Sequence, residues 1–409
     1  MKHFMYFIFL TFLWTSNVTA QSVSDTVVPK KQKKFTIIPM PVIAANPTTG
    51  LMYGVAPGIA WVNGNPKTTS ISNFLGTFIH TAKNQLLIQI RGNMFLEGDK
   101  WISTTDLRYN LNGQPTYGLS TSPIYADNTI VGNNKKVSDK PFNGPSESEM
   151  MYFDHFRLHQ TILKRHGDTR FFYGLGYHLD LISNIRDKEL NLAAIPPAIT
   201  HHYQYQAVKG LPVDKYSLSG ISLNASFDSR DNIANPYKGK LASIAFRINP
   251  SFIGSTASSS HLWLEYRDYF HVNKARPRNL IAFWTFGSFV TSGKVPYLFL
   301  PATGWDLFGR SGRPYTQGRF RGEDLSYTEF EWRFPLQSTK DKLGAVIFTN
   351  FTSASSRTQN IGLFNSFQMG YGAGFRYMLS EKNRVNIAID YGFGHNGASG
   401  LFLNLNEYF

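Results

Sequence analysis

Two pairs of histidines have the residue types and spacing that could bind a metal. His155 and His159 are separated as a metal-binding pair would be on a helix. The surrounding residues alternate between apolar and polar and predict a strand instead, on which the two side chains would be about 13 Å apart and could not share an ion. His201 and His202 are adjacent, and we expect them to be solvated in an outer loop. These residues therefore predict no metal ion and no cofactor.

An acidic cluster is the remaining candidate for chemistry. Asp228, Arg230 and Asp231 could form a metal or catalytic site. Pro236 and Gly239 follow closely, and they mark turns, which aspartate side chains commonly cap. We therefore interpret the cluster as a turn motif. The sequence has no Gly-x-Ser-x-Gly elbow, phosphate-binding loop or His-Glu-x-x-His zinc motif, so we expect no enzymatic activity.

Alternation of apolar and polar residues predicts the elements that position the other polar side chains. In segment 327–336 one face carries Glu329, Glu331 and Arg333, and the other carries Thr328, Phe330, Trp332 and Phe334. The same pattern recurs in segments 170–181, 367–379 and 385–393. Apolar faces toward lipid and polar faces toward a lumen are typical of the strands of an outer-membrane barrel.

The chain divides into about sixteen such strands. Their approximate spans are 36–44, 51–62, 69–81, 83–97, 100–112, 149–165, 169–184, 216–228, 239–250, 259–272, 278–291, 325–337, 342–353, 367–379, 383–394 and 400–409. The long connections 113–148, 185–215 and 292–324 all follow odd-numbered strands. Short periplasmic turns and long outer loops are usual in such barrels, so both termini should be periplasmic. We expect an all-β fold, a sixteen-stranded antiparallel transmembrane β-barrel over residues 35–409.

The beginning of the chain predicts export. Lys2 precedes an apolar run over residues 4–14, and small residues end at Ala20. This pattern predicts a secretory signal peptide over residues 1–20, since an apolar run of about eleven residues is too short to span a membrane as a helix. Residues 21–34 would be a short basic periplasmic lead-in. Its four lysines either contact acidic head groups or an acidic partner, or are solvated.

The last ten residues also alternate. One face carries Leu401, Leu403, Leu405 and Phe409, and the other carries Asn404, Asn406 and Tyr408. In a soluble protein this segment would be an exposed edge strand that invites pairing with other chains. In a barrel it is the closing strand, so we expect Phe409 to face lipid.

Composition favours a membrane barrel. Hydrophobic residues make up 42% of the chain, aromatic residues 15% and charged residues only 17%, compared with about 25% charged in a typical soluble domain. The net charge of +14 suits contact with outer-membrane lipids and lipopolysaccharide. Nucleic acid is not an expected partner, because the signal peptide exports the chain. The chain has no cysteine, which excludes disulfides and a lipoprotein anchor.

Two motifs are more specific than a generic barrel. They are the turn Asp228-Ser229-Arg230-Asp231-Asn232, and Gly318-Arg319-Phe320-Arg321-Gly322 followed by the strand with Glu331-Trp332-Arg333-Phe334-Pro335. Together they resemble the BamA/TamA-type outer-membrane assembly and translocation superfamily, also called the bacterial surface antigen family. The resemblance covers essentially the whole mature chain. It implies that an Arg-Gly tip of the sixth outer loop folds into the barrel and meets an acidic residue there. Arg321 and Gly322 match the tip, and Glu331 matches the acid.

The chemistry of these residues agrees with what the resemblance implies. A bidentate pair between Arg321 and Glu331 would offset the desolvation of a buried arginine and fix the loop. Alternatively, Arg321 is one of several solvated arginines in a basic outer loop. The chain departs from the family pattern at Glu323, Asn350 and Glu407, where an aromatic, an acidic and an apolar residue are usual. No polypeptide-transport (POTRA) domain fits in the lead-in, which implies a barrel-only branch.

Pro39 and Pro41 bear on how the barrel closes. They are two residues apart, so on a strand both missing N–H donors face the same neighbour. If that neighbour is the last strand, which carries Leu403 and Phe409, the seam is weak. In the resembled family a weak seam is the lateral gate for clients. Alternatively, both prolines lie in an irregular segment below the membrane.

The resemblance implies a non-enzymatic protein of the Gram-negative outer membrane. It would assist the insertion or translocation of client proteins or lipids, with separate periplasmic or lipoprotein partners. Two alternatives remain open. One is a passive pore or a structural or adhesive surface barrel without assembly activity. The other is a lipid-modifying barrel enzyme, although the sequence shows no nucleophile constellation.

Overall fold

The computed structural model describes residues 36–38, 41–46, 49–122, 149–195, 197–233, 235–307, 309–337, 342–381 and 384–409. The predicted signal peptide, the basic lead-in and Pro39 lie outside these residues. In the part of the chain that is described, no helix is long and apolar enough to cross a membrane.

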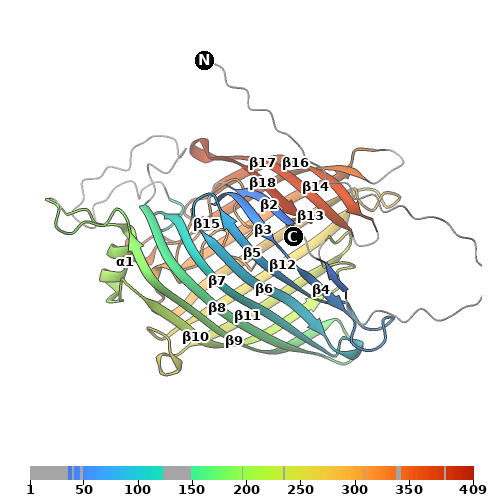
Figure 1. Ribbon diagram of the computed structural model, residues 1–409, viewed down its shortest axis with the longest axis horizontal. Helices are drawn as coiled ribbons and strands as arrows, with labels where there is room; N and C mark the ends of the chain where they lie inside the picture. Colours follow the sequence, from blue (N-terminus) through green and yellow to red (C-terminus); the bar gives the residue numbers. More distant parts are fainter. Residues whose placement is uncertain are drawn as a thin grey trace, which may run out of the picture. The chain divides into compact units, whose positions relative to one another are not determined.

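Antiparallel strands form a single barrel (Figure 1). Strands consecutive along the chain pair with one another, and β18 neighbours β2, which brings the two ends of the sheet together. Strand β1 pairs with β4, and β2 pairs with β3. The segments β1 and β2 therefore make up one interrupted barrel strand, and β3 and β4 make up the next. The eighteen segments of the described residues therefore make the sixteen barrel strands that the sequence predicts.

The strands have the following bounds: β1 Thr36–Ile38, β2 Pro41–Asn46, β3 Gly50–Val55, β4 Gly58–Trp61, β5 Ser72–Thr81, β6 Leu86–Phe95, β7 Trp101–Thr116, β8 Glu149–Arg165, β9 Phe171–Asp187, β10 Tyr216–Asp228, β11 Gly239–Asn249, β12 Ser259–His271, β13 Leu280–Gly293, β14 Asp324–Pro335, β15 Leu343–Ala354, β16 Gln368–Ser380, β17 Val385–Gly394 and β18 Ser399–Leu405. The helices of the described residues are α1 His201–Lys209 and the short 3-10 turns η1 Glu97–Asp99, η4 Ser251–Ile253, η5 Tyr297–Phe299, η6 Arg357–Gln359 and η7 His395–Gly397.

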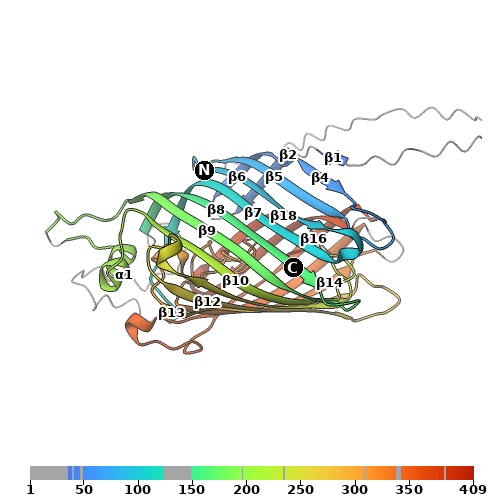
Figure 2. The same cartoon turned by 90° about the horizontal axis from the view of Figure 1, so that it is seen from below.

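The described parts of the long connections lie at one end of the barrel, as loop parity predicts. They follow β7, β9 and β13, and α1 belongs to the connection after β9. Figure 1 shows α1 at the left end and β4 toward the right, and Figure 2 shows the same separation from a second direction. Thr200 caps the start of α1, and the Tyr205 hydroxyl donates to the main-chain oxygen of Val295 at 3.0 Å. The helix therefore packs on the connection after β13.

The predicted lipid and lumen faces are confirmed. On β14, Phe330 and Trp332 are 42% and 44% exposed, whereas Glu329 and Glu331 have no exposed surface. The strands β9, β16 and β17 repeat this division, with aromatic residues outward and Asp180, Arg376 and Asp390 inward. Polar side chains find partners inside the barrel and not in lipid, which explains why these strands alternate.

The prediction that Phe409 faces lipid is wrong. Strand β18 ends at Leu405, Asn406 adopts a left-handed conformation with φ 67°, and the next three residues are buried. The Phe409 ring lies inside the barrel, 5.3 Å from the Trp284 ring between centroids. The charge of Glu407 gives the reason, because a carboxylate at this position is stabilised by a partner in the lumen and not by lipid. We call Asn406–Phe409 the inward tail.

Removing the Phe409 ring should destabilise the barrel. In Phe409→Ala we expect the free energy of unfolding to fall by about 3 kcal/mol, because a cavity opens in the cluster formed with Trp284 and Tyr269. Urea titration of the refolded barrel, followed by its electrophoretic band shift, measures this change. The control is Phe252→Ala, since Phe252 is 87% exposed and its loss should cost under about 0.5 kcal/mol. Equal stability of the two variants would show that the tail is not packed as described.

Candidate functional site in the barrel lumen

The connection between β13 and β14 folds into the lumen. This segment, residues 294–323, is called the lumenal loop; Phe308 is outside the described residues. Its contacts are with inward faces of strands on several sides: Arg91 on β6 and Arg108 on β7 both donate to the Leu307 main-chain oxygen, and the Tyr315 hydroxyl donates to Met369 on β16. The loop therefore occupies the interior, as the family resemblance implies.

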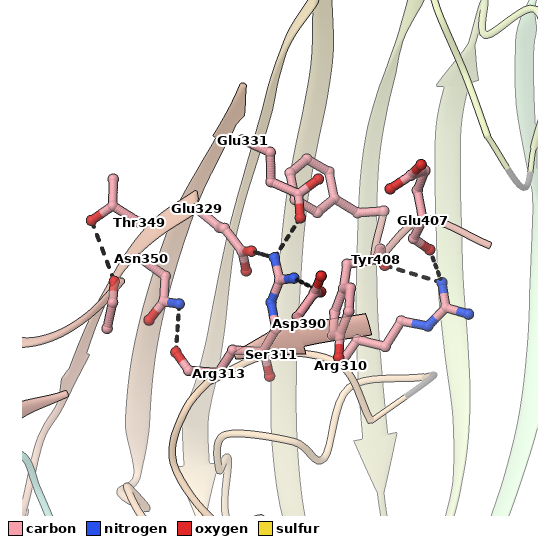
Figure 3. A network of polar contacts seen from close by, with 12 residues as sticks. Arg310, Ser311, Arg313, Glu329, Glu331, Thr349, Asn350, Asp390, Glu407 and Tyr408 are labelled. Atoms are coloured by element: carbon pink, nitrogen blue, oxygen red, sulfur yellow. Dashed lines mark hydrogen bonds and ion pairs between the residues drawn. The ribbon is translucent and has the colours of Figure 1, made fainter. Parts of the chain in front are cut away.

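Arg313 anchors the loop. Its guanidinium group forms ion pairs with Glu329 and Glu331 on β14 and with Asp390 on β17 (Figure 3). It also lies between two rings, with its central carbon 3.9 Å from the Phe348 centroid and 3.6 Å from the Tyr408 centroid. Arg313 is 1% exposed. Three carboxylates and two aromatic faces thus replace the water that a buried guanidinium loses.

Charge pairing around Arg313 extends into a network that we call the clamp. Arg333 contacts Glu331 at 2.6 Å, Arg376 contacts Asp390, and Arg376 contacts Glu407 at 2.7 Å. The clamp residues are Arg313, Glu329, Glu331, Arg333, Arg376, Asp390 and Glu407. Burial would lower the pKa of Arg313, but Glu329, Glu331 and Asp390 raise it well above the usual value. The guanidinium therefore stays charged.

Glycines and an asparagine of the barrel wall position the backbone of the lumenal loop. Asn350 Nδ2 donates to the main-chain oxygen of Arg313 at 2.6 Å. Gly370 on β16 faces the same oxygen so closely that an added Cβ would lie 2.2 Å from it. Gly392 and Gly394 on β17 similarly face Pro314 and Tyr315. The missing acid at Asn350, a departure from the family pattern, is thus replaced by an amide that holds the backbone.

The inward tail is tied to the lumenal loop. Arg310 NH1 donates to the main-chain oxygens of Glu407 at 2.5 Å and Tyr408 at 3.2 Å (Figure 3). Arg333 NH2 donates to the Phe409 main-chain oxygen at 2.9 Å. Glu407 also accepts from Asn386 Nδ2 at 2.6 Å. The residues that follow the last strand therefore belong to the same polar network as the loop.

The predicted pair between Arg321 and Glu331 is wrong. Arg321 is buried, but its NH1 group donates to the main-chain oxygens of Tyr297 at 2.9 Å and Leu300 at 3.3 Å. Burial lowers the pKa of Arg321, and Tyr297 and Tyr216 offset this lowering only in part. Arg321 and Gly322 thus hold the end of the lumenal loop that leads into β14. A Cβ atom added to Gly322 would lie only 2.2 Å from the main-chain oxygen of Ser355. The clamp arginine lies eight positions earlier, at Arg313.

The turn motif is stabilised by its own residues. Arg230 donates to both carboxylate oxygens of Asp228, at 3.0 and 2.7 Å. Asp231 accepts from the main-chain N–H groups of Tyr237 and Lys238, and Arg384 NH1 contacts it at 2.8 Å. Arg384 lies in the turn between β16 and β17. The motif therefore joins two turns that are distant in the sheet order, a structural role compatible with its interpretation as a turn.

The candidate histidines have protein partners. His155 and His159 both face the lumen, and their Nε2 atoms lie 3.2 and 2.7 Å from the two oxygens of Asp180. His201 contacts Glu149 at 3.0 Å, and His202 is buried in α1 near Tyr216, not solvated as predicted. Across the described ranges, no three His, Cys, Asp or Glu side chains are grouped so that they could hold a metal ion.

The seam is formed by short strands. Pro41 begins β2 opposite Val55 of β3, and Leu403 lies within β18. These strands have 6 and 7 residues, compared with 17 for both β8 and β9. Phe409 has left the wall, so it does not extend the seam. Fewer ladder hydrogen bonds can therefore form at this junction than between the long strands.

Comparisons with known proteins agree with this fold. A sequence model of the Omp85 superfamily domain matches residues 168–397. Among solved structures, BamA from Haemophilus ducreyi lacking POTRA domains 1–3 is similar at 13% identity and TM-score 0.56, with 92% of this chain and 71% of that one covered. CdiB from Acinetobacter baumannii is similar at 13% identity and TM-score 0.51, with 91% of this chain and 60% of that one covered. No curated protein matches the sequence.

Removing the Arg313 side chain should release the loop. In Arg313→Ala three buried carboxylates lose their partner, and we expect the free energy of unfolding to fall by about 3–5 kcal/mol. Urea unfolding measures stability, and limited proteolysis measures loop exposure. Arg357→Ala is the matched control, because Arg357 is 46% exposed beside Asp324 and its loss should cost under about 1 kcal/mol. Similar losses in both variants would contradict the clamp.

A methyl group at Gly370 should displace the loop without removing a charge. The added Cβ of Gly370→Ala would lie 2.2 Å from the Arg313 oxygen and 2.7 Å from Pro314 Cδ, so the loop backbone must move. We expect a loss of about 1–3 kcal/mol. Hydrogen–deuterium exchange of peptide 309–319 should rise. Gly362→Ala, whose Cβ would meet its nearest neighbour at 3.4 Å, should leave that exchange unchanged, and unchanged exchange in Gly370→Ala would count against the packing.

Proposed function

The chain belongs to the Omp85 superfamily of outer-membrane barrels, and on that premise we propose that it assists the insertion or translocation of proteins or lipids at the Gram-negative outer membrane. The role is non-enzymatic. Its partners are client proteins or lipids and separate periplasmic or lipoprotein components. The short turns face the periplasm and the long loops face outward.

One observation carries this proposal: the last strand is short, and the residues after it turn into the lumen, where they are tied to the lumenal loop. Strands β2 and β18 can share only a few ladder hydrogen bonds, each worth about 1 kcal/mol net. Pro41 contributes no N–H donor to them. Opening the barrel at this seam therefore costs much less than opening it between β8 and β9, which pair over most of their 17 residues.

The clamp sets what must move when the seam opens. Arg310 holds main-chain oxygens of Glu407 and Tyr408, and Arg313 stacks on the Tyr408 ring. The inward tail cannot leave the lumen while these contacts persist. We propose that the loop and the tail release together, so that β18 is freed for exchange with a client strand or for passage of a lipid.

The passive-pore alternative has less support. The lumenal loop and the inward tail fill the space beside β14 to β17, where the clamp side chains are nearly fully buried. A permanently open channel would leave these charges hydrated. An adhesive or structural surface role would instead require no movement of the seam.

A crosslink across the seam tests the proposal. The sequence has no cysteine, so Ile43→Cys on β2 and Leu403→Cys on β18, whose side chains both face lipid, introduce the only two thiols. If seam opening is required, oxidising this pair in native outer membranes should stop client insertion, and reduction should restore it. Leu107→Cys with Leu158→Cys is the matched control, because these residues are partners on β7 and β8. Full closure of the seam without any effect on insertion or growth would reject the assembly role and favour the passive barrel.

A further inference from the structure

A second polar cluster lies on the inner faces of β7, β8, β9 and β11. Arg108 contacts both oxygens of Asp106, at 2.5 Å each. Arg157 Nε contacts Asp180 at 2.7 Å, and Arg157 NH1 lies 3.8 Å from Asp106. Arg247 NH1 lies 3.3 Å from Asp180. Arginine and aspartate therefore alternate across the wall, and we call these five residues the arginine ladder.

The arginine ladder carries more positive than negative charge. Three guanidinium groups meet two carboxylates, and Arg91 on β6 adds a fourth cation that donates to the Leu307 oxygen. Including Asp306 of the lumenal loop leaves an excess of one positive charge. By contrast, the clamp has three arginines and four acids, which Arg310 brings to balance. The excess belongs to the ladder side of the lumen.

The ladder is also more open than the clamp. The side chains of Arg108, Arg157 and Arg247 are 13%, 12% and 14% exposed, and His159 beside them is 19% exposed. In the clamp, Arg313 is 1% exposed and Arg376 2%. Because the ladder lies on the inner wall, this surface faces the lumen. A solute that enters the lumen can therefore reach the ladder guanidinium groups.

The donors already converge on an oxygen acceptor. Arg91 NH1 and Arg108 NH2, from neighbouring strands, lie 3.1 and 2.7 Å from the Leu307 main-chain oxygen. A neutral carbonyl accepts these bonds without adding negative charge. An oxyanion in this position would accept the same bonds and also neutralise the excess, and guanidinium forks match the geometry of phosphate oxygens.

We infer that the arginine ladder is an anion-binding site of the lumen, and that its ligand is a phosphate group, either free or in a lipid head group. The site is independent of whether the seam opens. Binding would replace the Leu307 oxygen and loosen that part of the lumenal loop. Rings of arginine select anions in membrane pores for the same electrostatic reason.

Calorimetric titration of the purified full-length barrel with sodium phosphate, at constant ionic strength maintained with sodium chloride, tests the inference. The wild type should bind in a saturable manner. Arg108→Gln should weaken binding by roughly 10-fold or more, since Arg108 is one of the two donors to the Leu307 oxygen and its charge-assisted hydrogen bond to the phosphate is lost. Asp106→Asn should instead tighten binding, because it removes a competing carboxylate. This opposite sign keeps the test valid if Arg108→Gln folds poorly, as the band shift would reveal.

The matched control is Arg267→Gln. Arg267 also faces the lumen, but it is paired one to one with Glu265 at 2.6 Å, so its loss should leave phosphate binding unchanged. No saturable binding by the wild type, or equal binding by wild type and both ladder variants, would overturn the inference.

A second arm identifies the source of the phosphate group. The barrel is placed in phosphatidylcholine nanodiscs with or without phosphatidic acid, and phosphate is titrated again. If phosphatidic acid abolishes phosphate binding by the wild type, a lipid head group occupies the ladder. If binding persists with unchanged affinity, the ligand is the free anion. Binding that is lost equally in Arg267→Gln and in the ladder variants would contradict a site at the ladder.

Discussion

A guanidinium group buried inside a membrane barrel must be paired, and the interior of this protein is organised around that requirement at Arg313. Three carboxylates from β14 and β17 surround the group, and two rings cover its faces. Removing one member would leave charges in a medium that solvates them poorly. The glycines of β16 and β17 follow from the same constraint, because the loop backbone must come close enough for Arg313 to reach its partners.

The clamp connects two parts of the chain that are distant in the sequence. The lumenal loop precedes β14, the inward tail follows β18, and Arg310 and Arg313 contact the tail directly. A strand end that is tied to a loop can be loosened by moving the loop. Coupling of this kind needs no long pathway, since both segments share one set of ion pairs.

Two walls of the lumen use arginine differently. In the clamp Arg310 brings the charges to balance and the side chains are almost fully buried, which suits a contact that holds a loop. In the arginine ladder the charges do not balance and the side chains keep some exposure. The first arrangement stabilises the resting barrel, and the second leaves an electrostatic attraction for a mobile anion.

Alternation with a period of two was enough to predict the strands, their inward and outward faces and the lumenal position of Glu329 and Glu331. It was enough because burial in lipid on one side and pairing on the other act on every residue of a strand. The same rule could not choose Arg313 over Arg321, since loop residues carry no periodic signal and both arginines lie near glycines. It also extended the last strand to Phe409, because nothing in the local pattern showed that Asn406 turns the chain inward.

The sequence by itself therefore determined the barrel, its strand number, its loop parity and its family. Tertiary structure alone decided which arginine meets the acids, where the last three residues lie, and that His155, His159 and Arg157 converge on Asp180. These outcomes depend on strands far apart in the chain facing one lumen. A charge there is stabilised by whichever partner the closed barrel brings within reach. The spacing of residues along the sequence does not specify which partner that is.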